Sequence, residues 1–379
     1  MTPVKPQLLP LTGIRLFLAL WVVHYHLPIL RPGKSAFEPP AWIFVIHHNA
    51  DAVLGIFFIL SGFVLSYNYT LDQRWSKESL TRFAIARFAR IYPAYFLGLV
   101  LMVPIMINLA IQNFSYEKIA KDATMGALNL LLLQSWLPKT ALTWNYPGWS
   151  TATEAFFYCC FPFMGIALWK IRRPWPLFWA GLIIWVAALA APETAIALSL
   201  NRRPFWIPLL LCNPILRFPD FCLGIIAGRV YRRLLDCDSS LIGRGAWLYG
   251  PASVLLILAL VACGRWPHLA ADKELLLPLD MLLVLGLALG GGPLARFLSL
   301  PFIVFMGNVS FTIYILHVPV AQLTGLIARS LFHYRMGFTT LYVAVVCIAT
   351  VVYKFAEEPA TRKIRRRLNQ WSDARFRKR

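Results

Sequence analysis

Apolar stretches long enough to cross a lipid bilayer recur along almost the whole chain, separated by shorter polar segments. A membrane-spanning helix needs about 20 mostly apolar residues, and a helix satisfies its own backbone hydrogen bonds inside hydrocarbon. The pattern therefore predicts an all-α fold, a polytopic membrane helical bundle with about ten transmembrane helices. We expect the spans near residues 11–30, 50–69, 91–112, 150–169, 174–194, 206–229, 246–264, 275–292, 299–321 and 337–356.

The basic segments between the spans predict the orientation of the chain. Cytoplasmic loops carry an excess of Lys and Arg. All four basic clusters face the cytoplasm if both termini do and if the short apolar run 123–137 does not cross, so we expect 123–137 to be re-entrant or interfacial. This arrangement is that of a multi-pass protein of the inner (plasma) membrane with both termini cytoplasmic. The clusters lie at residues 70–90, 170–173, 229–233 and 354–379.

The composition agrees with a membrane protein, since 59% of the 379 residues are hydrophobic and 14% are charged. The formal net charge of +20 would suggest nucleic-acid binding in a soluble protein. Here basic loops and anionic lipids account for it, so we expect the lipid bilayer as a partner and no nucleic acid. We expect one transmembrane domain over residues 1–360 and a basic cytoplasmic tail over 361–379.

The seven cysteines show no spacing typical of metal ligands or redox motifs, and most lie in apolar runs. Cysteine in such surroundings behaves as a small hydrophobic residue. We therefore expect neither a disulfide framework nor a metal site.

Two ionisable residues of the first span, Arg15 and His26, are the first candidates for function, because charges inside a membrane are costly. Eleven positions at about 100° each bring both side chains to one helix face, about 16 Å apart. His24 falls on the opposite face. A cation and an imidazole on one stripe suit a long anionic ligand whose far end needs proton chemistry. The alternative is that His26 only bonds a neighbouring helix.

Glu154 is the third ionisable residue at a span, and it has two compatible interpretations. It opens the fourth apolar run, where a carboxylate is a candidate for catalysis. The sequence Thr151-x-x-Glu154 is also a capping box, in which the glutamate anchors the start of a helix. An anchored carboxylate is also a positioned one.

Three arginines, Arg82, Arg87 and Arg90, alternate with apolar residues at helical spacing before the third span. One interpretation is a basic amphipathic segment on the inner leaflet. The other is a phosphate clamp, because the planar guanidinium presents five donors in a fork. The predominance of Arg over Lys favours the clamp.

A polar stripe on the ninth span, Ser310, Tyr314 and His317, follows the i, i+4, i+7 pattern of one helix face, although core packing is an alternative. The helical rise along each span puts His26, Glu154 and His317 at one level near the outer face. It puts Arg15 and the group around Arg87 near the inner face. We therefore expect three ionisable groups from three spans to converge.

The motifs that carry these residues resemble, in order and spacing, those of the membrane-bound acyltransferase family 3. The similarity extends over about residues 10–360, and Thr12 departs from it, since an acidic residue is common at that position. The motifs are Leu11-Thr12-Gly13-Ile14-Arg15 with His26, Gly55-Ile56-Phe57-Phe58-Ile59-Leu60-Ser61-Gly62-Phe63, Arg87-x-x-Arg90-Ile91-Tyr92-Pro93, Leu130 to Trp136, Trp149-Ser150-x-x-x-Glu154-x-x-Phe157-Tyr158 and Ser310-Phe311-x-x-Tyr314-x-x-His317-x-Pro319.

This resemblance implies an integral-membrane O-acyltransferase that moves an acyl group, usually acetyl, from acetyl-CoA to a hydroxyl of a sugar. The donor co-substrate would be acetyl-CoA, and the acceptor a cell-envelope glycan or a glycosylated small molecule. The implied catalytic residues are His26 and Glu154, with His26 either a base or a covalent carrier. The implied donor-binding residues are Arg15, Arg82, Arg87 and Arg90, and the implied substrate-binding residues are Trp149, Ser310, Tyr314 and His317.

Two other function classes fit the same residues. A transporter or flippase of an envelope lipid or glycan would line its substrate or proton path with Arg15, His26 and Glu154. A catalytically silent scaffold would tolerate His26→Ala without effect. Release of CoA thiol from acetyl-CoA in the presence of a glycan acceptor distinguishes the enzyme from both.

Overall fold

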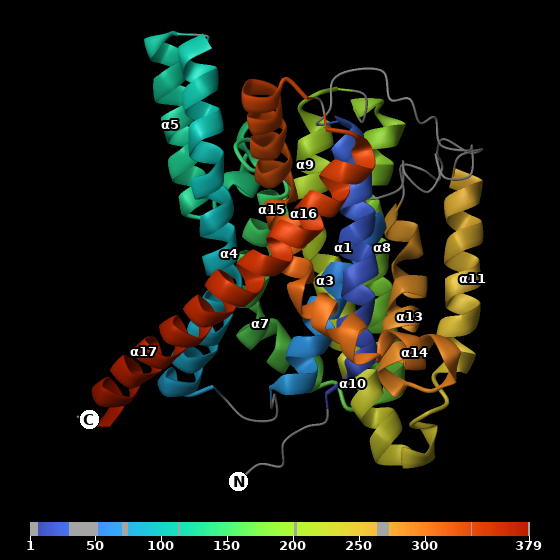
Figure 1. Cartoon of the computed structure of the whole chain (residues 1–379). Helices are drawn as coiled ribbons and strands as arrows, with labels where there is room; N and C mark the ends of the chain where they lie inside the picture. The colour runs from blue at the N-terminus through green and yellow to red at the C-terminus, as the bar shows by residue number, and fades with distance from the viewer. Residues whose placement is uncertain are drawn as a thin grey trace.

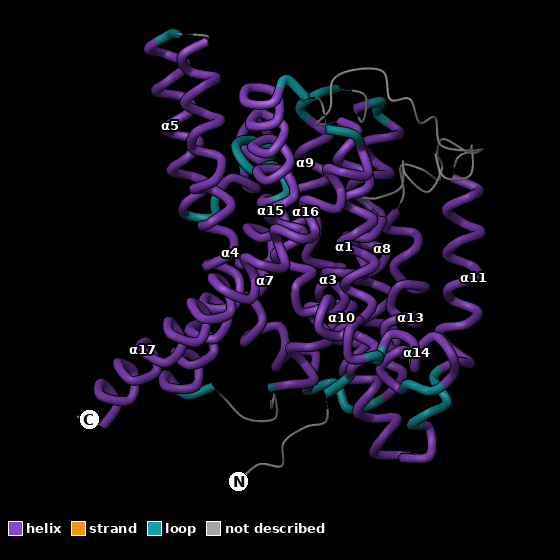
Figure 2. The backbone as a smooth tube through the Cα atoms, in the orientation of Figure 1, coloured by secondary structure: helices purple, strands orange, loops and turns teal. Residues whose placement is uncertain are grey.

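The computed structural model describes residues 7–29, 52–69, 75–112, 114–200, 203–263, 273–334 and 336–377 (Figure 1). Within these ranges the chain forms helices joined by turns and loops, without a strand (Figure 2). The predicted all-α helical bundle is therefore confirmed.

The helices follow the apolar runs of the sequence closely. The first part of the chain forms α1 (Leu9–Ile29), α3 (Ala52–Asn68), α4 (Lys77–Gln112), α5 (Tyr116–Leu130), η1 (Gln134–Trp136), α6 (Pro138–Ala141) and α7 (Gly148–Trp169). The middle forms α8 (Pro174–Ala197), α9 (Trp206–Cys212), α10 (Pro214–Cys237), η3 (Ser239–Leu241), α11 (Ala246–Cys263) and η4 (Lys273–Leu276). The last part forms α13 (Leu277–Leu289), α14 (Gly292–Leu298), α15 (Pro301–Phe332), α16 (Phe338–Val352), the π-helical η5 (Tyr353–Glu357) and α17 (Glu358–Arg377).

Six of the described helices are long and apolar enough to cross a membrane, and a seventh counts if α13 and α14, bent by 77°, form one span. The six are α4, α7, α8, α9 with α10, α15, and α16 with α17. The helices α3 and α11 are apolar but shorter, and α1 carries Arg15 and two histidines along its 21 residues. The structure thus confirms a membrane protein with several spans but does not confirm the count of ten.

Three elements differ from the expected boundaries. The third span is the end of a continuous 36-residue helix, α4, which already begins in the basic segment. The run 123–137 is divided between the end of α5 and the separate turn η1, and α5 packs beside α4 (Figure 1). The sixth span is broken between α9 and α10, because the Asn213 side chain accepts a hydrogen bond from the amide of Ile215 and Pro214 follows it.

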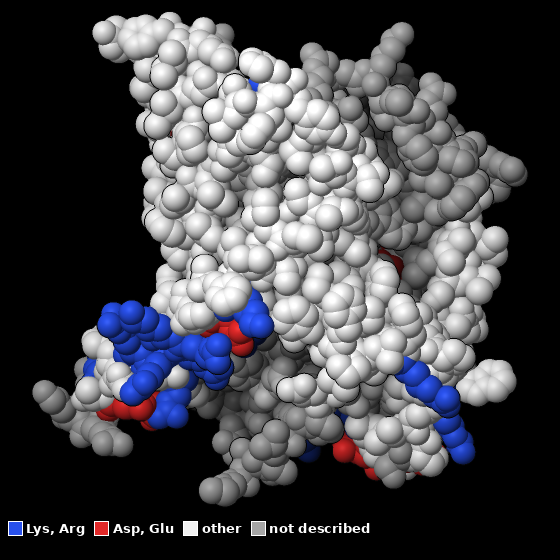
Figure 3. Space-filling model, viewed as in Figure 1, with Lys and Arg blue, Asp and Glu red and all other residues white. Residues whose placement is uncertain are grey.

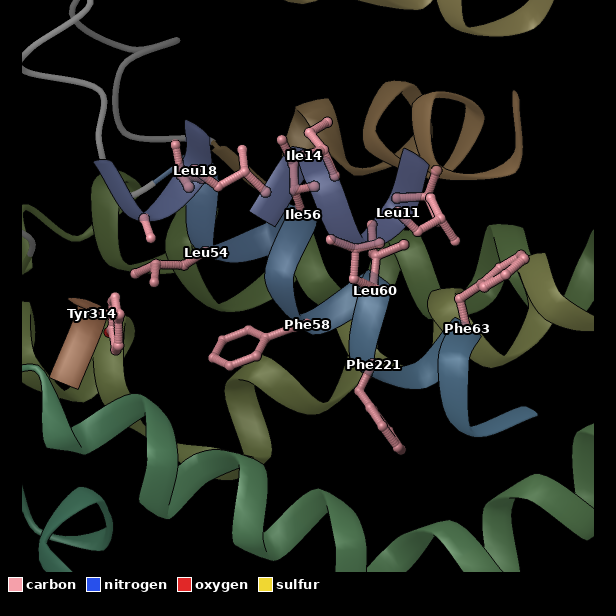
Figure 4. Close-up of a cluster of buried hydrophobic side chains, with 14 of the residues drawn as sticks. Leu11, Ile14, Leu18, Leu54, Ile56, Phe58, Leu60, Phe63, Phe221 and Tyr314 are labelled. Carbon is pink, nitrogen blue, oxygen red and sulfur yellow. The ribbon is translucent and has the colours of Figure 1, made fainter. Parts of the chain in front are cut away.

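The core is built where small residues let helices approach closely. A methyl group on Gly62 of α3 would lie 2.1 Å from the carbonyl oxygen of Phe221, and one on Gly224 of α10 would lie 2.2 Å from that of Ile59. Such small-residue contacts are the usual way for membrane helices to pack. Figure 4 shows apolar side chains of α1, α3 and α10 filling the surrounding space, with Tyr314 of α15 at one edge.

The segment from η1 to the start of α7 is folded into the bundle and fixes the position at which α7 begins. Gln134 donates to the carbonyl of Gly148 at 3.1 Å, and Ser135 donates to that of Trp149 at 2.7 Å. Asn145 donates to the carbonyl of Ile315 in α15 at 2.8 Å. All three side chains are buried, so the start of α7 is covered by this segment.

Candidate active site

A pocket lies between α1, α3, α7 and α15, and its empty space amounts to about 560 Å³, part of it open to the exterior. Its two charged lining residues are Arg15 and Glu154. The remaining wall combines hydroxyl groups with aromatic and aliphatic side chains: Leu54, Phe57, Phe58, Ser61, Ser150, Thr151, Ser310, Phe311 and Tyr314. Such a lining, mostly apolar with a few convergent polar groups, is typical of a small-molecule site.

Glu154 is held from two helices by hydroxyl donors. Ser61 of α3 donates to its Oε1 at 2.9 Å, and Tyr158, one turn further along α7, donates to the same oxygen at 2.5 Å. The capping-box interpretation is wrong, because α7 begins at Gly148 and Thr151 lies inside the helix. The carboxylate is thus positioned by neighbouring side chains and faces the pocket.

Arg15 lines the same pocket as this carboxylate. Arg15 lies within electrostatic range of Glu154, Arg87 and Arg90. The guanidinium of Arg87 lies 5.8 Å from the ring centroids of both Tyr69 and Tyr158, as in a cation–π contact. Arginines from α1 and α4 therefore form a cationic end to the pocket.

Arg90 also faces a second carboxylate. Its Nη1 lies 3.5 Å from Oε1 of Glu357 in the π-helical turn η5, and Thr312 of α15 donates to the other oxygen of Glu357. π-Helical turns inside α-helices are frequent at functional sites. Arg90 is therefore neutralised in part and anchored to α15 through Glu357.

Arg82 does not join this cluster. Its Nη2 lies 2.7 Å from Glu78 and 3.0 Å from Asp373 of α17, and all three side chains are exposed. Of the three arginines in the phosphate-clamp hypothesis, Arg87 and Arg90 therefore lie beside the pocket, whereas Arg82 links α4 to α17.

His26 and His317 form a hydrogen-bonded pair. Nδ1 of His26 lies 2.9 Å from Nε2 of His317, and the two rings are stacked at 5.0 Å with an interplanar angle of 3°. The Tyr146 ring lies edge-on to His26 at 4.9 Å. The two histidines lie beyond the lining of the pocket and adjoin it through Tyr314, one turn before His317.

The backbone determines which nitrogen of each histidine carries the proton. Nδ1 of His317 bonds to the carbonyl oxygen of Tyr314, and a carbonyl can only accept, so Nδ1 carries the hydrogen. In a neutral imidazole the other nitrogen is then an acceptor. Nε2 of His317 accordingly accepts from Nδ1 of His26, which leaves Nε2 as the basic nitrogen of His26.

The prediction that His24 lies on the opposite face of α1 from Arg15 is confirmed. Its ring packs edge-on against Phe338 and Tyr342 of α16, at 5.1 and 6.4 Å. The helical-face argument thus separates the two histidines of α1 correctly.

The expected meeting of Glu154 with His26 and His317 at one level is wrong. His26 and His317 meet, whereas Glu154 lines the pocket with Arg15, and neither histidine is among the residues that line it. The expectation placed the start of α7 at the outer surface. The buried side chains of Gln134 and Ser135 instead bind the first residues of α7, through hydrogen bonds to the carbonyls of Gly148 and Trp149.

The remaining candidates divide between the pocket and the core. Ser310 and Tyr314 line the pocket, and the hydroxyls of Tyr314 and Ser150 lie 2.7 Å apart. Trp149 does not line it, since its side chain is buried and packs edge-on against Phe58. Trp149 therefore has a packing role at this position.

Sequence reasoning assigned no role to three residues that bind the charged groups of the site, Ser61, Tyr158 and Glu357. For two of them the sequence contained a feature that could have pointed to the role. Ser61 is a hydroxyl in an apolar run, and Tyr158 follows Glu154 by four residues, the spacing of neighbours on one helix face. No sequence feature pointed to Glu357, because it lies far along the chain from the other site residues and beside a basic tail.

The comparisons with known proteins identify the family of the chain. The family model Acyl_transf_3, described as an acyltransferase domain, matches residues 10–354. The chain therefore belongs to acyltransferase family 3.

Two relatives are similar over parts of the chain. Acyltransferase MdmB of Streptomyces mycarofaciens is 31% identical over 248 residues, which are 61% of this chain and 59% of MdmB. An uncharacterized protein of Haemophilus influenzae is 27% identical over 190 residues, which are 48% of this chain and 75% of that protein. The chain thus spans about three fifths of the length of MdmB. No solved structure gives a significant match.

No group of three or more His, Cys, Asp or Glu within the described ranges is placed to hold a metal ion. The polar groups of the site instead suit an anionic ligand at one end and proton transfer at the other.

Proposed function

We propose that this protein is an integral-membrane O-acyltransferase that moves an acetyl group from acetyl-CoA to a hydroxyl of a sugar or glycan. The observation that carries the proposal is the order in which the polar side chains of the site follow one another through the bundle. Arg87 and Arg90 come first, Arg15 and Glu154 follow in the pocket, and the pair of His26 and His317 comes last. The name of the relative MdmB supports the reaction class.

The donor would bind by its phosphates at the cationic end. The guanidinium fork suits phosphate oxygens better than a Lys ammonium does. Arg15 and His26 are about 16 Å apart along α1, so an extended arm anchored at the arginines would carry its thioester towards His26. Arg82 has no part in this donor site, because its contacts hold α17 against α4.

The histidine pair would supply the base. The acceptor hydroxyl loses its proton to Nε2 of His26 while its oxygen bonds to the thioester carbon, the carbon–sulfur bond breaks, and the CoA thiolate leaves and takes up the proton. His317 would stabilise the imidazolium that forms, since its Nε2 accepts the hydrogen on Nδ1 of His26. His317 is thus a positioning residue in this scheme, whereas Ser310 and Tyr314 contact substrate.

Glu154 would act on the donor side of the pocket. Its carboxylate faces Arg15 and is held by Ser61 and Tyr158, so it would keep the Arg15 guanidinium aligned for the donor.

The reaction is tested with protein purified in detergent, given acetyl-CoA and a glycan acceptor. We expect release of CoA thiol together with an acetylated acceptor, both absent for His26→Ala and both retained for His24→Ala. Thiol release that is equal in the two variants would contradict the role of His26.

We also propose that the side bearing both chain termini faces the cytoplasm of the inner membrane (Figure 1). Figure 3 shows Lys and Arg gathered there over α17, as the positive-inside bias requires. The chain crosses the membrane ten times if α1, α3, α11 and α13 cross it in addition to the six long helices. A reporter fused after Arg379 should be active only in the cytoplasm, and activity outside it would refute this orientation.

A further inference from the structure

A second cavity, separate from the acyltransferase pocket, lies between α8, α10 and α13. Its space is about 1300 Å³ in all, open in part to the exterior of the bundle, and its wall is apolar except for Arg233. None of its lining residues belongs to the first pocket. Because it lies on spans, its opening faces the hydrocarbon of the bilayer.

The length of this cavity matches one leaflet. Its lining residues run from Pro174 to Trp185 on α8 and from Leu223 to Leu234 on α10. Eleven residues of helix rise about 16 Å, and half of a bilayer core of about 30 Å is about 15 Å. An acyl chain of a membrane lipid therefore fits along the cavity from end to end.

The end of the cavity at Pro174 and Leu234 is cationic. Arg233 donates to the backbone carbonyl of Arg172, which brings α10 against the turn between α7 and α8. Arg172 and Arg173 are exposed in that turn. Within the described residues, no carboxylate forms an ion pair with any of these three arginines.

Two more arginines of α10 lie close in sequence to Arg233 but outside the lining of the cavity, and Arg232 also donates to the carbonyl of Tyr67 in α3. Arg229 and Arg232 lie over the ring of Trp169 at the end of α7, at 4.5 and 5.1 Å from its centroid. Basic pockets between membrane helices on the cytoplasmic side are suited to anionic head groups. An apolar slot of one leaflet's length with a cationic rim is complementary to an anionic phospholipid.

We propose that this cavity binds an anionic phospholipid, with its chain between α8, α10 and α13 and its head group at Arg172, Arg173 and Arg233. The bound lipid would fix α8, which is weakly buried along its length, against α10. This site is independent of the acyl-transfer reaction.

The test uses full-length protein in detergent and two changes, one at each end of the lipid. Gly181 lines the cavity, and a Cβ there would meet only Ile226, at 3.8 Å, so Gly181→Phe introduces a bulky side chain into the slot from a position where a Cβ has room. Arg233→Gln removes the charge at the rim. The matched controls are Gly250→Phe on α11, where a Cβ would meet nothing within 4 Å, and Arg296→Gln on α14.

The measurements are the melting temperature with added phosphatidylglycerol, phosphatidylcholine or inorganic phosphate, and native mass spectrometry for retained lipid. We expect phosphatidylglycerol to raise the melting temperature of the wild type and of both controls by roughly 5 °C. Phosphatidylcholine and phosphate should have a smaller effect. Gly181→Phe and Arg233→Gln should lose the shift and the retained lipid.

Two results would overturn the proposal. One is an equal shift with inorganic phosphate alone, which would show a phosphate site without a lipid slot. The other is an unchanged phosphatidylglycerol shift and retained lipid in Gly181→Phe, which would place the lipid elsewhere on the protein.

Discussion

Replacing His317 with Phe tests the histidine pair most sharply, because it keeps the ring and removes both of its hydrogen bonds. His317 is fully buried with its ring parallel to that of His26 and the centroids 5.0 Å apart, and Phe keeps a planar aromatic side chain at this position. The lost interaction is the bond from Nδ1 of His26 to Nε2 of His317, at 2.9 Å. In the transition state this bond stabilises a charged imidazole, and a hydrogen bond to a charged group contributes about 1.5–3 kcal/mol.

That free energy corresponds to a fall in kcat of roughly 10- to 100-fold. Because His317 lies beyond the cationic end, the KM for acetyl-CoA should change by less than about threefold, as expected for loss of a bond made in the transition state. The assay is acetyl-CoA-dependent thiol release at varied donor concentration. His24→Phe, on the opposite face of the same helix, is the control and should keep most of the activity.

The reasoning fails if His317→Phe retains more than about half of the wild-type kcat, because a charge-stabilising bond of this kind contributes far more than that. It also fails if the KM for acetyl-CoA rises while kcat is unchanged, since His317 would then belong to the donor site.

Three further changes test other parts of the structure. Glu154→Gln keeps an acceptor for Ser61 and Tyr158 but removes the counter-charge of Arg15, so we expect a near-normal melting temperature and transfer lowered about 10-fold or more; normal transfer would remove Glu154 from the site. The double change Arg87→Lys with Arg90→Lys should raise the KM for acetyl-CoA more than it lowers kcat, because a point charge cannot reproduce the fork; an unchanged KM would leave these residues with a packing role. Gly62→Ala places a methyl group 2.1 Å from the carbonyl oxygen of Phe221, so it should lower the stability by about 1–3 kcal/mol. The measurement is the melting temperature, with Gly250→Ala as the control. Equal melting temperatures of the two variants would contradict the close crossing of α3 and α10.

The sequence was sufficient to predict most helices, because long apolar runs admit few other structures in a membrane. It could not predict where α4 begins, since the basic segment continues the same helix without a break at the expected boundary. The break between α9 and α10 depends on the hydrogen bond of the Asn213 side chain. The pattern of apolar residues does not report such a bond.

For the site, the argument along one helix succeeded, whereas the argument between helices was right for His26 and His317 and wrong for Glu154. The angle per residue separated His24 from Arg15 and His26, because it depends on α1 alone. The start of α7 depends on hydrogen bonds from Gln134 and Asn145 to the carbonyls of Gly148 and Ile315, and such bonds leave no periodic signal in the sequence. The contact of His317 with His26 could be predicted from the sequence, since both residues were expected at one level.

Transfer of a labelled acetyl group tests the central claim most directly. Membrane vesicles that expose the side bearing both termini, prepared with wild-type protein or with His26→Ala, are given acetyl-CoA labelled in the acetyl group. We predict that the label becomes covalently attached to glycan in the wild-type vesicles, in step with release of CoA thiol, and that His26→Ala vesicles show neither. Movement of a lipid or glycan across the membrane by the wild type, without any attached label, would contradict the account and identify a transporter.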